Sequence, residues 1–444
     1  MKGFKKIALW ITVLFMFVSA SFSLLPNRTS AAENDSLGLN AEAAILVDAE
    51  TGAILYEKNA DVVLGVASMS KMMTEYLVLE AIKDGSISWD QKVTISEYIH
   101  NLSSPNMGLS NVGLTQGEQY TVKELYEAMA IFSANAATSA LAEVVGGTEK
   151  GFVELMNKKA EELKLEQYKF VNSSGLNNSD LLGNHPAGNP DEENVMSAKA
   201  TARLAYHLLN DFPEVIDTAS KPVLKFRDGR DYKNFNYMLP GLVFHYPGVD
   251  GLKTGSTDFA GFGFTATAKR DDNRFITVVM KTSSKEERFT ETRKLLDYAF
   301  GNYTKEEIVA KGTEIKGHKT LPVTKGKEDS VQIKSADSIE LAIKKGEEKN
   351  FQPVLKLDNK KLNDEGELTA PIKKGDKVGT LTVQPKEGEP FEFLTEDGVK
   401  SVTIDVIASE DVEKANWFVL SMRAVGGFFA DIWGSVSSTV KGWF

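Results

Sequence analysis

The chain has 444 residues, of which 42 % are hydrophobic and 25 % are charged, an ordinary globular composition with enough sequence for two or three domains. It has no cysteine, which excludes disulfides, thiolate metal sites and a cysteine nucleophile. The formal net charge of −11 argues against a nucleic-acid partner. The five scattered histidines form no His-Glu-x-x-His motif, and there is no P-loop or Gly-x-Ser-x-Gly elbow, so we expect no metal and no cofactor.

The first 31 residues have the layout of a secretory signal peptide. Three lysines precede an apolar run over 7–18, and small residues follow up to Ala31-Ala32. An uncleaved membrane anchor is the alternative, but this run is short for a membrane span. Residues 1–31 carry four basic and no acidic side chains, so their removal changes the net charge from −11 to −15. We therefore expect an exported and acidic mature chain.

A hairpin and a buried helix are predicted next. Residues 43–57 alternate around Gly52, which is typical of two strands joined by a glycine-containing turn. Apolar residues then recur at helical spacing from Met69 to Ile82 and stop at Asp84-Gly85. This pattern predicts a helix that lies inside a core.

Ser68 and Lys71 stand three residues apart where this helix begins. Residues at that spacing share one helix face, so the Lys71 amine is expected within reach of the Ser68 hydroxyl. A desolvated lysine can take the proton of a serine and make it a nucleophile, and a helix N-terminus favours a developing oxyanion. The Ser-x-x-Lys pattern is weak alone, because a second copy, Ser438 to Lys441, lies in the tail with no other site feature near it.

The middle of the chain has mainly helical patterns. Residues 86–120 are rich in Ser, Asn and Gly and are predicted to be irregular. Thr121 and Glu124 form a capping box that opens a helix through Phe132, and Ser133-Ala134-Asn135 then interrupts the helical pattern. The remaining predictions for this region are helices over 136–145, 148–163 and 197–209, with a loop over 170–190.

The pattern returns to strands over 245–282. Lys253-Thr254-Gly255 leads into an alternating strand over 261–268, and a second strand follows over 274–280. A helix is predicted over 288–303. Strands at both ends with helices between them predict one sheet that is built from both ends of the domain and has helices on its faces.

The C-terminal third has a different hydrophobic pattern from the rest of the chain. After residue 305, short alternating runs separated by Lys, Gly, Asp and Glu turns predict a separate β domain of about 100 residues. From Asn416 to the end, large apolar residues recur at three- and four-residue steps with polar residues between them. This predicts an amphipathic helix that anchors the chain to a membrane surface, and a helix docked on the protein's own core is the alternative.

Three motifs occur in order: Ser68-x-x-Lys71 at a helix start, Ser133-x-Asn135 between helices, and Lys253-Thr254-Gly255 on a strand. Together they resemble the signature of the penicillin-binding protein and serine β-lactamase superfamily. The flanking residues 67–74, 170–176 and 251–257 are similar to those of the low-molecular-weight, penicillin-binding protein 5-like D-alanyl-D-alanine carboxypeptidases. The resemblance covers essentially the whole chain.

The resemblance implies the architecture. We expect an α/β (α+β) serine β-lactamase/DD-peptidase-like domain, whose antiparallel sheet has helices on both faces, followed by a small all-β domain and an amphipathic C-terminal helix. The expected boundaries are 1–31 for the signal peptide, 32–305 for the catalytic domain, 306–410 for the β-rich domain and 411–444 for the anchor helix.

The resemblance also implies a role for each motif residue. Ser68 attacks the carbonyl between two D-alanines and forms an acyl-enzyme. Lys71, held neutral by burial and by the nearby positive Lys253, is the base. Ser133 relays a proton to the departing D-alanine, and Asn135 holds the substrate amide and the Lys71 side chain.

Substrate binding is implied in the same way. The backbone N–H groups of Ser68 and Ser256 form the oxyanion hole, and Thr254 and Gly255 let the extended stem peptide pair with the strand. The terminal carboxylate needs a cation. Arg288 resembles the arginine that the family uses, and Arg274 is the competing candidate.

The implied partners are a peptidoglycan stem peptide ending in D-Ala-D-Ala, β-lactams as covalent inhibitors, and the extracytoplasmic membrane surface.

Three alternatives to a carboxypeptidase function remain. A class A β-lactamase needs a deacylating glutamate, and residues 166–178 lack a convincing Glu-x-x-x-Asn. A transpeptidase shares the acylation half of the reaction. A non-catalytic penicillin or peptidoglycan sensor is disfavoured, because every catalytic position is filled.

Overall fold

A computed structural model describes residues 35–422 of the chain. The predicted signal peptide and most of the predicted anchor helix lie outside the described residues. Within the described part, no helix is both long enough and apolar enough to cross a membrane.

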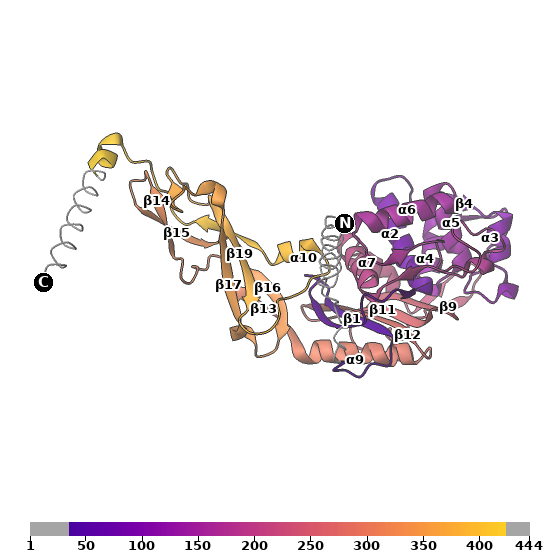
Figure 1. Cartoon of the computed structure of the whole chain (residues 1–444). Helices are drawn as coiled ribbons and strands as arrows, with labels where there is room; N and C mark the ends of the chain where they lie inside the picture. The colour runs from indigo at the N-terminus through magenta and orange to yellow at the C-terminus, as the bar shows by residue number, and fades with distance from the viewer. Residues whose placement is uncertain (1–34, 423–444) are drawn as a thin grey trace, which may run out of the picture. The chain divides into compact units, whose positions relative to one another are not determined.

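An antiparallel sheet forms the centre of the N-terminal part (Figure 1). β1 pairs with β12 from Ala43↔Met280 to Asp48↔Phe275, and with β2 in the predicted hairpin. The first and last strands of this part therefore lie side by side, as predicted. The spatial order of the five strands is β10 (Val249–Thr257), β11 (Gly261–Arg270), β12 (Asn273–Thr282), β1 (Ala43–Asp48) and β2 (Ile54–Lys58).

Helices cover both faces of this sheet (Figure 1). α9 (Glu287–Asn302) packs on β11 and β12, whereas α7 (Ala198–Asp211) packs on β12 and β1 from the other side. The predicted fold class is confirmed. The other helices of this part are α2 (Lys71–Lys83), α3 (Glu97–Leu102), α4 (Val122–Phe132), α5 (Asn135–Gly146), α6 (Glu149–Glu162) and α8 (Val215–Ala219).

The predicted irregularity of residues 86–120 is wrong in part. Ser96 caps α3 by accepting a hydrogen bond from the backbone N–H of Ile99 (3.2 Å). Only Ile99 and Leu102 are buried in this six-residue helix, so too few apolar positions exist to give a helical period. Two short strands, β4 (Lys92–Thr94) and β5 (Gln119–Thr121), also pair within residues 86–121.

Other short paired strands lie elsewhere in the N-terminal part: β3 (Leu64–Gly65), β6 (Tyr168–Lys169), β7 (Val195–Met196), β8 (Val223–Lys225) and β9 (Asp231–Lys233).

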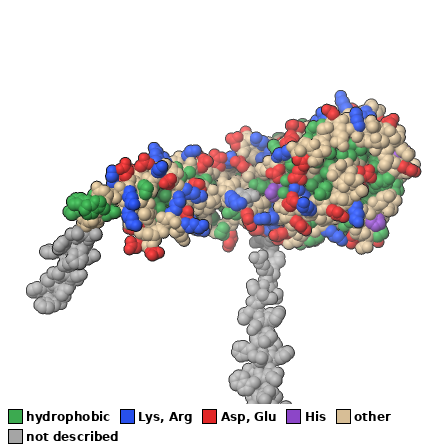
Figure 2. Space-filling model, turned by 90° about the horizontal axis from the view of Figure 1, so that it is seen from above, with side chains coloured by type: hydrophobic (Ala, Val, Ile, Leu, Met, Phe, Trp, Pro, Cys, Tyr) green, Lys and Arg blue, Asp and Glu red, His purple; other side chains and the backbone are tan. Residues whose placement is uncertain are grey.

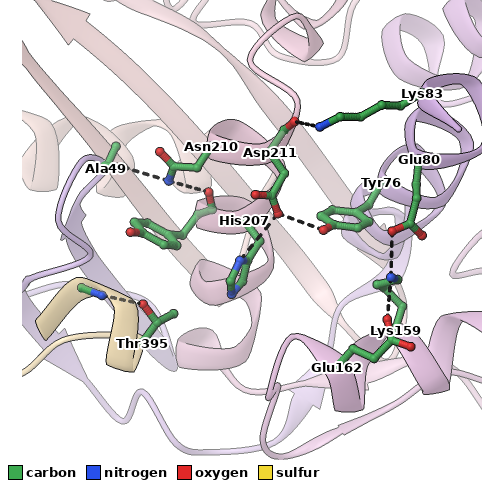
Figure 3. A network of polar contacts seen from close by, with 12 residues as sticks. Ala49, Tyr76, Glu80, Lys83, Lys159, Glu162, His207, Asn210, Asp211 and Thr395 are labelled. Carbon is green, nitrogen blue, oxygen red and sulfur yellow. Dashed lines mark hydrogen bonds and ion pairs between the residues drawn. The ribbon is translucent and has the colours of Figure 1, made fainter. Parts of the chain in front are cut away.

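α2, which starts at Lys71, is joined to its neighbours α7 and α6 by polar contacts (Figure 3). Tyr76 donates a hydrogen bond to Asp211 Oδ2 on α7 (2.8 Å). Glu80 forms an ion pair with Lys159 on α6 (2.8 Å), which also pairs with Glu162 (2.6 Å). Such partly exposed pairs contribute about 0–1 kcal/mol each, so their effect is to orient the helix more than to stabilise the fold.

The C-terminal part consists mainly of β-strands and includes the short helix α10 (Glu396–Ser401). The short alternating runs predicted after residue 305 fall mostly within or beside strands, except the run at Glu314-Ile315, which forms only an isolated bridge. β13 was not predicted, because it begins at Tyr303 directly where α9 ends. β17, β19, β20, β15, β14 and β18 form one sheet in that order, and β13 pairs with β16. The strands are β13 (Tyr303–Val309), β14 (Thr320–Thr324), β15 (Ser330–Ser335), β16 (Ile339–Lys344), β17 (Phe351–Leu357), β18 (Leu368–Thr369), β19 (Lys377–Pro385) and β20 (Ile404–Ala408).

Candidate active site

A cleft of about 310 Å³ lies where β10, the start of α5 and a 3₁₀ turn over Ala67–Ser70 come together. It brings residues from all three sequence motifs to one place. Lys71 and Lys253 are buried and do not line it. The lining residues are Ser68, Gly108, Leu109, Ser110, Ser133, Asn135, Leu176, Phe235, Thr254, Gly255, Ser256, Phe262, Lys285 and Arg288.

Lys71 is 0 % exposed and makes three short contacts through Nζ. The distances are 2.8 Å to Ser68 Oγ, 2.8 Å to Asn135 Oδ1 and 2.6 Å to the carbonyl oxygen of Ser174. A neutral amine has two N–H groups and one lone pair. Because two carbonyl oxygens accept the N–H groups, the lone pair of a neutral Lys71 points at Ser68 Oγ. The Ser68 hydroxyl then donates to Lys71, which is the arrangement that a general base requires.

The electrostatics favour the neutral form of Lys71. Burial is the main cause that holds its pKa well below the usual range, and the positive charge of Lys253 adds to the effect. Burial also lowers the pKa of Lys253, to about 8, so this amine stays mainly protonated at neutral pH. The carboxylate of Glu75, which is buried one turn further along α2, acts in the opposite direction and raises the pKa of Lys71. Burial raises the pKa of Glu75 to about 7, which weakens that opposition.

Asn135 is the first residue of α5, and its amide is oriented by the loop that precedes α4. Its Nδ2 donates to the Ser110 carbonyl (3.1 Å), so Oδ1 faces Lys71. The backbone N–H of Asn135 donates to the same carbonyl (2.9 Å), and Ala136 N–H donates to Asn111 Oδ1 (2.8 Å). Three hydrogen bonds therefore fix the acceptor that holds the lysine.

Ser133 ends α4 in the left-handed region, with φ of 58°. A non-glycine residue in this conformation costs on the order of 1 kcal/mol, which the surrounding helices must offset. Its buried Oγ has no hydrogen-bond partner among the described residues, although Ser133 lines the cleft. The helix break predicted from the sequence thus presents an unsatisfied hydroxyl at the site.

The Ser174 carbonyl was missed by the sequence analysis, because a backbone acceptor has no side-chain signature. It belongs to a tight turn in which Asn172 Oδ1 accepts from the N–H groups of Ser174 (3.2 Å) and Gly175 (2.7 Å). Gly175 has φ of +79°, and a Cβ there would lie 1.8 Å from the Ala67 carbonyl oxygen. Only glycine permits this approach to the turn that carries Ser68. The Asn-x-x-Gly spacing was the available signal.

β10 lies against the same turn from the other side. A Cβ at Gly255 would lie 2.5 Å from the Val66 carbonyl oxygen, so glycine is required for this contact also. β10 is an edge strand of the sheet, which leaves one side of its backbone unpaired within the sheet. Thr254 and Ser256 line the cleft on this strand. An extended peptide can add to such an edge by backbone hydrogen bonds.

The two candidate arginines have different surroundings. Arg274 forms two hydrogen bonds with the Asp250 carboxylate (2.9 and 2.7 Å) and does not line the cleft. Arg288 is 2 % exposed and lines it. Its Nη1 reaches only the carbonyls of Gly255 (3.3 Å) and Gly263 (3.4 Å), and within residues 35–422 it forms no ion pair with a carboxylate. Burial lowers its pKa to about 10, so it remains a cation at neutral pH.

Within the described part of the chain, no group of three or more His, Cys, Asp or Glu side chains is placed to hold a metal ion. The side chains at the cleft offer hydroxyls, amines, an amide and a guanidinium.

Comparisons with known proteins assign the family. A family model described as D-alanyl-D-alanine carboxypeptidase matches residues 28–284. The chain belongs to this family. A second model, described as penicillin-binding protein 5, C-terminal domain, matches residues 303–414. The D-alanyl-D-alanine carboxypeptidase DacF of Bacillus subtilis is 32 % identical over 414 residues, which is 93 % of this chain and 95 % of that protein.

Solved structures agree with the assignment. A peptidoglycan synthesis regulatory factor, PBP3 of Streptococcus pneumoniae, has a TM-score of 0.69 at 35 % identity, covering 84 % of this chain and 99 % of that one. Penicillin-binding protein D2 of Listeria monocytogenes in an ampicillin-bound form has a TM-score of 0.50 at 35 % identity, covering 59 % of this chain and 98 % of that one. The predicted family and enzyme class, a serine-type D-Ala-D-Ala carboxypeptidase, are confirmed.

Proposed function

We propose that the enzyme removes the terminal D-alanine from peptidoglycan stem peptides through an acyl-enzyme on Ser68. The observation that carries this proposal is the three-way contact of Lys71, which leaves its lone pair to the Ser68 hydroxyl. Lys71 takes the proton while Ser68 Oγ bonds to the carbonyl carbon between the two D-alanines. The C–N bond then breaks, and the departing amine receives a proton.

Ser133 is the group we assign to that proton return. Ser133 lines the cleft together with Asn135, and its buried Oγ has no hydrogen-bond partner among the described residues, so it is available to pass a proton from the Lys71 ammonium to the leaving nitrogen. We assign the oxyanion hole to the backbone N–H groups of Ser68 and Ser256, two residues that line the same cleft. Asn135 holds the substrate amide, and the stem peptide adds to the edge of β10 next to Thr254 and Gly255.

We assign the terminal carboxylate to Arg288, helped by Thr254. What supports this is that Arg288 is a buried cation whose charge is not met by any carboxylate in the described residues. β-Lactams carry a comparable carboxylate beside a strained amide, and the related Listeria protein is known in an ampicillin-bound form. We infer that β-lactams acylate Ser68 in the same cleft.

The proposal predicts that the purified enzyme releases free D-alanine from a short peptide ending in D-Ala-D-Ala, but not from the matched peptide ending in L-Ala-L-Ala. No release from the D-Ala-D-Ala peptide would refute it. Fluorescent penicillin should label the enzyme stably. Rapid hydrolysis of the label would indicate a β-lactamase instead, and a peptide joined to an added amine acceptor would indicate a transpeptidase.

We further propose that the enzyme works at the extracytoplasmic face of the membrane, exported by its signal peptide and held by its C-terminal helix. The described chain ends in a helical turn over 417–422, where Trp417, Phe418 and Met422 are 77 %, 59 % and 60 % exposed. Figure 2 shows hydrophobic side chains gathered at this end of the described chain. Large exposed apolar side chains on a helix are suited to the headgroup region of a membrane.

Deletion of residues 416–444 should move the exported enzyme from the membrane fraction to the soluble fraction, because it removes the whole amphipathic segment. Fractionation followed by penicillin labelling measures this, and the labelling rate should not change. Substitution of the polar Ser421 by alanine is the matched control and should leave the enzyme on the membrane. Unchanged membrane binding of the truncated enzyme would refute the anchor.

A further inference from the structure

Lys285 lines the same cleft as Ser68 and has no role in the mechanism so far. It lies in the short connection between β12 and α9, three residues before Arg288, and is half-buried. A lysine on a surface loop usually has many accessible rotamers, because its stem is long and flexible. Lys285 is more restricted than that, because aromatic rings surround its amine.

The Lys285 Nζ lies 5.7 Å from the ring centroid of Phe235 and 5.1 Å from that of Tyr237. Both distances are within the range of a cation–π interaction. Phe235 stacks on Phe132 at 5.1 Å, and Tyr237 stacks on Phe289 at 5.6 Å. These two supporting rings immediately precede Ser133 and follow Arg288 in the sequence. The lysine is therefore held by the same packed rings that place the two site residues.

The charge of Lys285 is not matched by a carboxylate. Within residues 35–422 neither Lys285 nor Arg288 forms an ion pair with Asp or Glu. Two acidic residues are close in sequence to Lys285. The Glu287 carboxylate binds Ser283, because it accepts hydrogen bonds from the backbone N–H and the Oγ of that residue (2.7 Å each). Glu286 is exposed and acts on Arg288 only through its field. Two cations thus line the cleft, and among the described residues neither is paired with a carboxylate.

We propose that Lys285 is a specificity-determining residue that, together with Arg288, binds the free α-carboxylate of the terminal D-alanine. This inference rests on the proposed function of the cleft. A carboxylate has two oxygens and can be bound by two cations from different directions. A chain that continues past this position, or ends in an amide, has no charge to offer them. Lys285 would therefore favour substrates with a free C-terminus over internal or amidated D-Ala-D-Ala sequences.

The test compares one peptide ending in D-Ala-D-Ala as the free acid and as the amide. For Lys285→Met, kcat/KM for the acid should fall about five-fold, the scale of a partly exposed ion pair, whereas kcat/KM for the amide should not change. Lys285→Arg should retain the preference for the acid. Lys269→Met, which changes an exposed lysine on β11 outside the cleft, is the matched control and should change neither value.

A second comparison does not depend on peptide hydrolysis. The rate of covalent labelling by benzylpenicillin should fall in Lys285→Met, and labelling by its methyl ester should not. An equal loss for acid and ester, or no loss for either, would overturn the role of Lys285, since a merely structural change would affect both ligands alike. Suppose that wild-type enzyme is labelled faster by benzylpenicillin than by its methyl ester, through Lys285, and yet releases no D-alanine from any peptide. That result would refute the proposed function and still support the carboxylate site.

Discussion

Replacing Ser68 by alanine should abolish covalent labelling by penicillin and reduce D-alanine release by a factor on the order of 10⁴ or more, as expected when a nucleophile is removed. The physical reason is local. Ser68 Oγ is the hydroxyl 2.8 Å from the Lys71 amine. Without this oxygen no acyl bond can form. Intact-protein mass after incubation with benzylpenicillin measures the result directly, because the adduct adds the mass of the whole drug.

Ser70→Ala is the matched control for this prediction. Its hydroxyl belongs to the same turn but is buried and donates to the Ala67 carbonyl (2.7 Å), away from the cleft. This variant should keep the adduct and lose at most about 1–2 kcal/mol of stability. An adduct of unchanged yield on Ser68→Ala, mapped to Ser133 or another serine, would show that the nucleophile has been misassigned.

The structure also indicates how one base can serve both halves of the reaction. Among the described residues, no Asp or Glu lines the cleft. In the proposed reaction, Lys71 becomes neutral again once the proton has passed to the departing D-alanine, and its two carbonyl partners would still direct its lone pair toward Ser68 Oγ. We expect the same amine to activate the water that hydrolyses the acyl-enzyme.

Much of the fold was predictable because its signals are local and repeated. The capping box at Thr121 is present, with Glu124 N–H donating to Thr121 Oγ1 (3.1 Å) and Thr121 N–H donating to the Glu124 carboxylate (2.8 Å). The hairpin over 43–57 and the strands over 261–280 had clear alternation, and their shared sheet followed from the order of elements. α3 was not predicted, because a six-residue helix has too little periodicity.

The cleft was predictable only as far as side chains define it. Ser68, Ser133 and Asn135 were predicted from the sequence motifs, and the structure places these three residues in the lining of one cleft. The Ser174 carbonyl was not predictable in the same way, because its position depends on a turn that Asn172 and Gly175 create in three dimensions. Choosing between the two candidate arginines needed the structure for a similar reason: the pairing partner of Arg274 is distant in sequence.

Replacing Lys71 by methionine, which has similar length but no amine, should slow acylation of Ser68 by about 10²–10⁴-fold, the usual contribution of a general base. In the wild-type enzyme the rate should fall as the pH drops through the lowered pKa of Lys71, since a protonated amine cannot accept the serine proton. The methionine variant should lose this acid limb. Labelling with fluorescent penicillin, quenched at a series of times and repeated at acidic and neutral pH, measures both effects. Thermal denaturation shows whether each variant is folded.

Lys71→Arg separates a role as base from a role as positive charge. The guanidinium stays protonated at any pH that the folded enzyme tolerates, so it restores the charge but cannot accept a proton. We therefore expect Lys71→Arg to be as slow as Lys71→Met. If a folded Lys71→Arg enzyme were instead acylated nearly as fast as wild type, Lys71 would act through its charge. In that case the lowered pKa produced by burial and by Lys253 would work against catalysis rather than for it.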